Sequence, residues 1–135
     1  MPALTYVGFY AELVPDDTAP HHGSLREALS PPGDYPPEPV AAYLEAGHPV
    51  LDLTEGTRDV IGDAFHVPGG VSVLTDGTFV WRLDLAAYVR HYTPALPGPL
   101  LTRALASPAA ASPLSRDALL AITGRVVADL GFRTG

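Results

Sequence analysis

The chain has 135 residues, a net charge of −7 and an apolar share of 47%, values typical of one domain with a buried core. Cysteine and lysine are both absent, which excludes disulfides, thiolate metal sites, P-loop phosphate binding and lysine Schiff bases. No apolar run reaches the length of a membrane span and no signal peptide is visible, so we expect a cytoplasmic chain that forms a single domain over residues 1–135.

Negative charge is concentrated in the first half of the sequence. Residues 1–63 carry eleven acidic residues and two arginines, whereas residues 64–135 carry four acidic residues and six arginines. This balance disfavours nucleic-acid binding, which needs clustered cations, and it is compatible with docking onto a basic protein surface. The simpler interpretation, that an acidic surface keeps the protein soluble, stays open.

The first predicted elements lie in a segment rich in aromatic and β-branched residues. Residues 4–14 predict a strand buried on both faces, in which Gly8 marks a bulge or a close backbone approach. A proline-rich loop over about 15–39 follows, and it contains a short helix in which Ser24 and Glu27 form a capping box.

A second helix is predicted over residues 39–46, because proline suits the first helical position and Gly47 suits a left-handed residue after the last. A short strand over 50–53 comes next. Beyond it the pattern is weaker, and residues 59–61 are predicted as either a brief strand or a turn.

The clearest pattern is a β-hairpin with strands 71–75 and 78–82 around Asp76-Gly77. A type I′ turn requires positive φ at both central residues, and Asp-Gly is one of the pairs that accept it. Such a turn pairs Thr75 with Thr78, Leu74 with Phe79, Val73 with Val80 and Ser72 with Trp81. Both faces of the hairpin are then largely apolar, so we expect it inside the sheet rather than at an exposed edge.

Helices dominate the rest of the chain. Asp84 is predicted to cap a helix with an apolar stripe over 85–92. A second proline-rich loop spans about 93–113 and includes a short helix, and a final helix covers 115–130. The order of elements predicts an α+β domain whose mostly antiparallel sheet is built around the Asp-Gly hairpin and covered by helices; a βαβ unit within residues 4–53 would make the sheet mixed.

The usual catalytic motifs are missing from this sequence. It has no Gly-x-Ser-x-Gly elbow, no His-Glu-x-x-His helix, no calcium loop and no dinucleotide fingerprint. Its five histidines show no metal-ligand spacing, so we predict neither a metal nor a cofactor. His66 with Asp63 or Asp59 is the one pairing that we consider for acid–base catalysis.

Trp81, Arg82 and Asp84 form another conspicuous group, at the junction of a strand and a helix. The structural interpretation is that Trp81 packs in the core and that Arg82 and Asp84 form a local ion pair. The functional interpretation is a binding rim, because tryptophan and arginine are over-represented in interface hot spots.

The stretch from Gly69 to Tyr92 contains the pattern Thr-Asp-Gly-x-Phe-x-Trp followed by Asp-Leu-x-x-Tyr-Val. This pattern resembles a hairpin and helix of small uncharacterised actinobacterial proteins, some of which look like immunity proteins of polymorphic-toxin systems. The absence of lysine and the abundance of Ala, Pro, Gly and Arg fit a GC-rich genome. The resemblance implies an inhibitor or binding protein, and it carries over no functional residue.

We therefore expect a non-enzymatic binding protein of the immunity type, which neutralises a protein partner, such as a basic toxin domain, through an acidic surface. The predicted partner-binding residues are Asp52, Glu55, Asp59, Asp63 and Arg82. One alternative is a small hydrolase or transferase that uses Asp59, Asp63 and His66, and another is a structural or oligomer-forming module.

Overall fold

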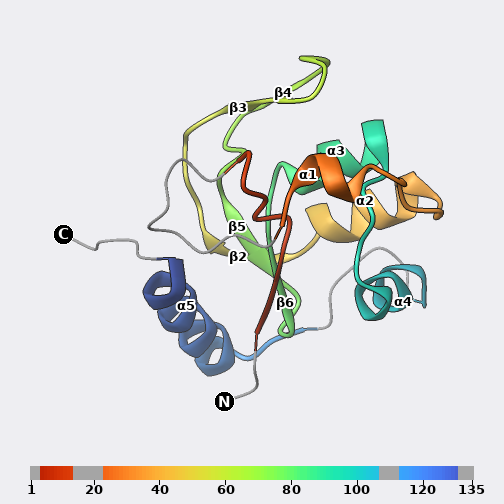
Figure 1. Cartoon of the computed structure of the whole chain (residues 1–135). Coiled ribbons are helices and arrows are strands. Elements are labelled where there is room, and N and C mark those ends of the chain that lie inside the picture. The colour runs from red at the N-terminus through yellow and green to blue at the C-terminus, as the bar shows by residue number, and fades with distance from the viewer. Residues whose placement is uncertain (1–3, 14–22, 107–112, 131–135) are drawn as a thin grey trace.

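The computed structural model describes residues 4–13, 23–106 and 113–130, and these form an α+β fold, as the sequence predicted (Figure 1). The strands are β1 (Thr5–Val7), β2 (His48–Leu51), β3 (Thr57–Arg58), β4 (His66–Val67), β5 (Val73–Thr75) and β6 (Phe79–Arg82). The helices are α1 (Leu25–Ala28), α2 (Pro37–Glu45), α3 (Leu85–Tyr92), α4 (Gly98–Ala106) and α5 (Arg116–Leu130). No helix in these three ranges is long and apolar enough to cross a membrane.

Four of the strands form one mixed sheet in the order β1-β6-β5-β2, and β3 pairs with β4 in a separate two-stranded sheet. The β5–β6 and β2–β5 pairs are antiparallel, whereas β1 runs parallel to β6. The sheet is therefore mixed, but its parallel pair joins β1 to β6 rather than two strands within residues 4–53. The hairpin strands β5 and β6 take the two central positions, which confirms that the hairpin lies inside the sheet.

The sheet is covered on both faces, with α1 to α4 on one side and α5 on the other (Figure 1). Leu74, Phe79 and Trp81 pack in the larger hydrophobic cluster with residues of α1 to α4. Val73 and Val80 point to the opposite face, where they pack with residues of α5. The predicted division of the hairpin into two apolar faces is confirmed, because alternation along a strand fixes which residues share a face.

The register of the hairpin differs from the predicted one by two residues. Leu74 lies opposite Trp81 and Thr75 opposite Val80. Gly77 has a φ of +103°, but Asp76 is not among the residues with positive φ, so the predicted type I′ turn is wrong. The Asp76 carboxylate explains the difference, because its Oδ1 atom accepts hydrogen bonds from the Thr78 and Phe79 amides at 3.0 and 2.8 Å and closes the turn one residue later.

The N-terminal strand is shorter than the predicted 4–14. Gly8 has a φ of +82°, and a Cβ atom there would lie 3.0 Å from the Leu85 side chain, which confirms the predicted close approach. This conformation ends β1. Phe9 and Tyr10 then pack in the two different hydrophobic clusters.

The predicted capping box at α1 is wrong. Glu12, rather than Glu27, caps the helix, because its carboxylate accepts hydrogen bonds from the Leu25 and Arg26 amides at 2.8 and 3.0 Å. The Ser24 hydroxyl donates to the same carboxylate at 2.7 Å. The capping group thus comes from a distant part of the sequence, which local spacing cannot reveal.

Two further details of the helices differ from the predictions. Helix α2 begins at Pro37, two residues early, and Gly47 after its end does not have a positive φ. A Cβ at Gly47 would lie 2.6 Å from Cζ2 of Trp81, so the glycine is needed for close packing rather than for a left-handed turn. Residues 15–22 and 107–112 of the two predicted proline-rich loops, and residue 14 of the predicted first strand, lie outside the described residues.

Candidate functional site: the Asp59 loop

The β3–β4 hairpin extends away from the four-stranded sheet (Figure 1). Arg58 pairs with His66 at the end of the two strands next to the loop. Residues 59–65, which we call the Asp59 loop, connect the strands. The Asp59 amide donates a hydrogen bond to the Phe65 carbonyl at 3.0 Å, which brings the two ends of the loop together. A short hairpin such as this has little stability of its own, so it depends on contacts with the rest of the molecule.

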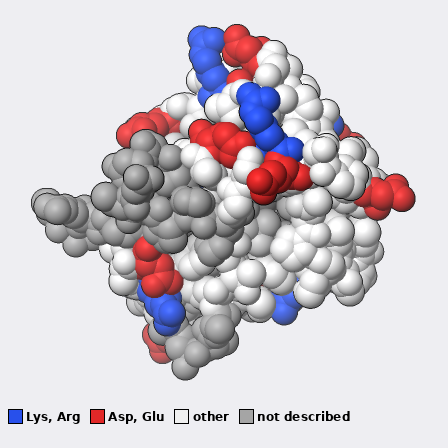
Figure 2. Space-filling view, in the orientation of Figure 1, with Lys and Arg blue, Asp and Glu red and all other residues white. Residues whose placement is uncertain are grey.

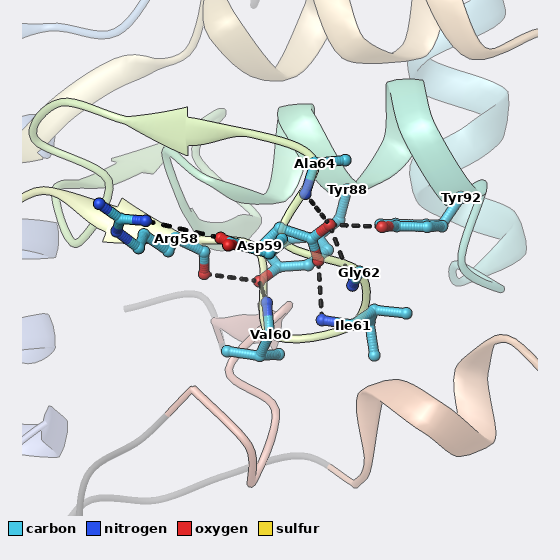
Figure 3. Close-up of polar contacts among 9 residues, drawn as sticks. Arg58, Asp59, Val60, Ile61, Gly62, Ala64, Tyr88 and Tyr92 are labelled. Carbon is cyan, nitrogen blue, oxygen red and sulfur yellow. Dashed lines mark hydrogen bonds and ion pairs between the residues drawn. The ribbon is translucent and has the colours of Figure 1, made fainter.

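The carboxylate of Asp59 organises the loop from the inside (Figure 3). It accepts hydrogen bonds from the amides of Ile61, Gly62 and Ala64 at 2.8, 3.2 and 2.9 Å, and a further one from the Tyr92 hydroxyl. Asp59 is only 5% exposed. Burial acts to raise the pKa of this carboxyl, but the hydrogen bonds favour the ionised form more strongly, so its pKa lies below the usual value.

Helix α3 provides a second attachment through Tyr88, which is buried one turn before Tyr92. Its hydroxyl accepts a hydrogen bond from the Val60 amide at 3.0 Å and donates one to the Arg58 carbonyl at 3.3 Å (Figure 3). The Phe65 ring stands edge-on to Tyr88, with ring centroids 4.8 Å apart. Helix α3 therefore holds the loop through both hydrogen bonds and aromatic contacts.

The base of the hairpin is tied to the sheet through a buried ion pair. The Thr57 hydroxyl donates to Oδ2 of Asp84 at 3.0 Å, and the Arg82 guanidinium donates to the same carboxylate in a two-point contact at 3.1 and 3.0 Å. Arg82 also donates to the Leu13 carbonyl at 3.0 Å. The prediction that the Asp84 side chain caps α3 is therefore wrong: Asp84 stands at the N-cap position, but its carboxylate binds Arg82 and Thr57 and makes no capping hydrogen bond.

The outer surface of the loop and of the adjoining β3 residue presents the apolar Val60 and the two charged side chains of Arg58 and Asp63. Val60 is 40% exposed, whereas the side chains of Arg58 and Asp63 are 75% and 72% exposed and lie 3.7 Å apart. Asp63 has a φ of +51°, a left-handed conformation that aspartate tolerates better than most residues. Asp59 and Tyr88 hold the loop backbone, so the exposed side chains start from a backbone of fixed conformation.

The structure separates the predicted partner-binding residues into two groups. Asp52, Glu55 and Asp63 are exposed, whereas Asp59 and Arg82 are buried and used in the internal contacts described above. Arg82 is 6% exposed, so its local ion pair with Asp84 accounts for it and it offers no charge to the surface. Figure 2 shows acidic and basic atoms interspersed on the face in view, rather than one continuous acidic area.

The predicted acid–base pair does not come together. His66 is exposed on β4 with its ring beside Gly56, and within the described ranges no hydrogen bond or ion pair joins it to Asp63 or Asp59. Nor do those ranges hold a group of three or more side chains arranged to bind a metal ion. The geometry therefore lends no support to catalysis by these residues.

Sequence reasoning missed Tyr88 and Tyr92 of α3 as residues that hold the loop, because their spacing with Leu85 and Val89 is that of a core-facing stripe. The signal that could have identified them is their chemistry. A tyrosine at a buried position needs a hydrogen-bond partner for its hydroxyl, which a leucine does not. Asp59 followed closely by a glycine is also typical of a turn closed by the aspartate side chain.

No family model matches the chain, and neither a curated protein nor a solved structure matches it.

Proposed function

We propose that the protein is a non-enzymatic, cytoplasmic binding protein of the immunity type, which inhibits a protein partner, and that the Asp59 loop is its recognition element. The observation that carries the proposal is the internal carboxylate of Asp59. It is buried, it holds three backbone amides and the Tyr92 hydroxyl, and it leaves the neighbouring Val60 at the surface.

Rigidity of this kind favours binding over the alternatives. Association costs conformational entropy when a flexible loop must become ordered at an interface, and a loop that is already fixed avoids most of this cost. Here the Asp59 carboxylate and the hydroxyls of Tyr88 and Tyr92 hold the loop backbone before any partner is bound. An exposed apolar side chain beside exposed charges is also the composition of an interface centre with a polar rim.

The resemblance of residues 69–92 to immunity-type proteins supports the inhibitor class. The acidic first half of the chain favours a basic partner, because opposite charges accelerate association. Asp52, Glu55 and Asp63 are the predicted contributors to this attraction, since their side chains are exposed.

Photo-crosslinking tests the proposal in cells of the organism that encodes the chain. A photoreactive amino acid in place of Val60 should form a crosslink to one protein, whereas the same amino acid in place of Leu120 should not. Leu120 lies on α5 and is 58% exposed, so it is a matched control for an exposed apolar position away from the loop. The crosslinked protein should arrest growth when produced alone, and co-production of this chain should restore growth.

The Asp59→Ala variant should lose the rescue, because the loop backbone loses its internal acceptor. Identical crosslinking from positions 60 and 120 would contradict the assignment of the loop. A crosslinked partner that is harmless, or whose activity this chain leaves unchanged, would contradict the inhibitor class.

A further inference from the structure

A shallow pocket of about 150 Å³ lies outside the Asp59 loop, at the end of the four-stranded sheet where β2 ends and β5 begins. Its walls are mainly apolar and are formed by Pro49, Leu51, Leu74 and Leu83. The pairing of β2 with β5 is irregular between Pro49 and Leu51, so the edge strand does not follow its neighbour closely at this point.

One charged group stands at this pocket. Asp52 is exposed, and within the described ranges its carboxylate takes part in no hydrogen bond or ion pair. The other polar side chain of the lining, Ser72, is already satisfied, because its hydroxyl donates to the Leu53 carbonyl at 3.0 Å and accepts from the Leu53 amide at 2.9 Å. The pocket therefore combines apolar walls with the carboxylate of Asp52, for which the described part of the chain supplies no partner.

This combination fits the two parts of an arginine side chain. The aliphatic stem of arginine buries readily against apolar surface while its charged end stays near water. The guanidinium group forms two parallel hydrogen bonds with a carboxylate, and it sheds its hydration more easily than an ammonium group does. An apolar cavity of about 150 Å³ holds a molecule the size of benzene, so the stem fits the space.

We infer that the pocket receives an arginine side chain of a protein partner, with the stem against Leu51 and Leu83 and the guanidinium on Asp52. This inference rests on the proposed function and names the chemistry that the partner presents to a second part of the surface. Charge complementarity selects this occupant. Arg82 lies opposite Val73, a lining residue, in the hairpin. It does not repel an incoming arginine, because Asp84 neutralises its charge. Arginine is also enriched at protein interfaces.

A random peptide library displayed on phage, selected against the immobilised full-length chain, tests the inference without knowledge of the natural partner. The selected peptides should be enriched in arginine. Replacing that arginine in the best peptide by citrulline, its neutral isostere, should weaken binding by about tenfold, the effect expected when a hydrogen bond to a charged group is lost. Asp52→Asn should weaken binding by a similar factor.

The decisive measurement is the coupling between the two changes. If the arginine contacts Asp52, the two changes are not additive. The citrulline peptide and the Asp52→Asn variant together should lose no more affinity than either change causes alone. Asp34→Asn is the matched control, because it removes one exposed negative charge outside the lining and should leave peptide affinity nearly unchanged. Circular dichroism checks that each variant is folded, as expected for surface changes.

Two results would overturn the inference. One is selection of peptides without arginine, and the other is a citrulline effect that is as large for the Asp52→Asn variant as for the wild type and the Asp34→Asn variant. Crosslinking from position 60 would be unaffected by either result, so a failure of this inference is distinguishable from a failure of the proposed function.

Discussion

The hydroxyl of Tyr92, in the last turn of α3, donates a hydrogen bond to the carboxylate of Asp59, in the loop between β3 and β4. Tyr88, one turn earlier on the same helix, holds the loop backbone on either side of Asp59. One helix thus packs against the sheet with its aliphatic residues and fixes the loop with its tyrosine hydroxyls. The order of the loop is therefore coupled to the position of α3.

Removing the Asp59 carboxylate should loosen the loop while the core stays intact. In the Asp59→Ala variant the amides of Ile61, Gly62 and Ala64 lose their acceptor, so their hydrogen exchange should accelerate, whereas amides of β5 and β6 should exchange as in the wild type. Tyr92→Phe is the control, because it removes one bond and leaves the three amide contacts in place. Unchanged exchange at the three amides would show that Asp59 does not order the loop.

The cap on α1 should make stability depend on pH in the acid range. Partial burial acts to raise the pKa of Glu12, but hydrogen bonds from the Ser24 hydroxyl and two helix amides outweigh it and lower the pKa to about 2. Because the folded-state pKa lies below the unfolded value of 4.5, the stabilisation is complete above about pH 5 and is lost as the pH falls toward 2. The Glu12→Gln variant should be less stable by about 1 kcal/mol at pH 7.

Urea unfolding at a series of pH values measures this difference between Glu12→Gln and the wild type. The difference in the free energy of unfolding should shrink below pH 4.5 and vanish near pH 2. A difference that is the same at pH 7 and pH 2 would mean that the charge of Glu12 plays no part in the cap.

Trp81 should be the most costly single truncation in the sheet. Its side chain is fully buried and its indole nitrogen donates to the Leu44 carbonyl at 2.9 Å. Trp81→Ala should lower the free energy of unfolding by roughly 3–5 kcal/mol, since it leaves a large cavity. Trp81→Phe should cost less, because it fills much of the space and loses mainly the hydrogen bond. Chemical denaturation of the three proteins gives the order, and equal losses for the two variants would contradict this account.

Two glycines should respond to alanine in opposite directions. A Cβ at Gly47 would lie 2.6 Å from the Trp81 ring, so Gly47→Ala should destabilise the fold by about 1–3 kcal/mol. Gly124 lies inside α5, and among the described residues no atom beyond its own helix lies within 4 Å of the Cβ position. Gly124→Ala should therefore stabilise the protein by about 0.5–1 kcal/mol. Thermal unfolding compares the two, and a shift in the same direction would refute the explanation.

Periodic features of the sequence predicted the fold class and the two faces of the hairpin. Alternation along β5 and β6 survives a change of register by two residues, so the faces were right although the partners were wrong. The turn itself depends on where the Asp76 carboxylate points, and that carboxylate is held by the Tyr43 hydroxyl at 2.7 Å. Such a contact between a turn and a remote helix leaves no trace in local spacing.

The candidate site was only partly predictable for the same reason. Asp59 was chosen for its charge, as a residue that would meet a partner, whereas the structure uses that charge inside the loop. Burial of Asp59 depends on the approach of α3, whose tyrosines lie far along the chain. Composition identifies the acidic segment, but only tertiary contacts distinguish its structural acids from its exposed ones.

The parallel pairing of β1 with β6 has a consequence for the order of folding. Thr5 lies beside Phe79, and most elements of the fold come between them in the chain, whereas β5 and β6 are joined by a tight turn. Local pairs form quickly and distant pairs must close a long loop first. During synthesis on the ribosome, the first strand emerges long before its partner exists. The sheet is therefore completed last by the strand that is made first, which leaves β1 without its neighbour until the hairpin has formed.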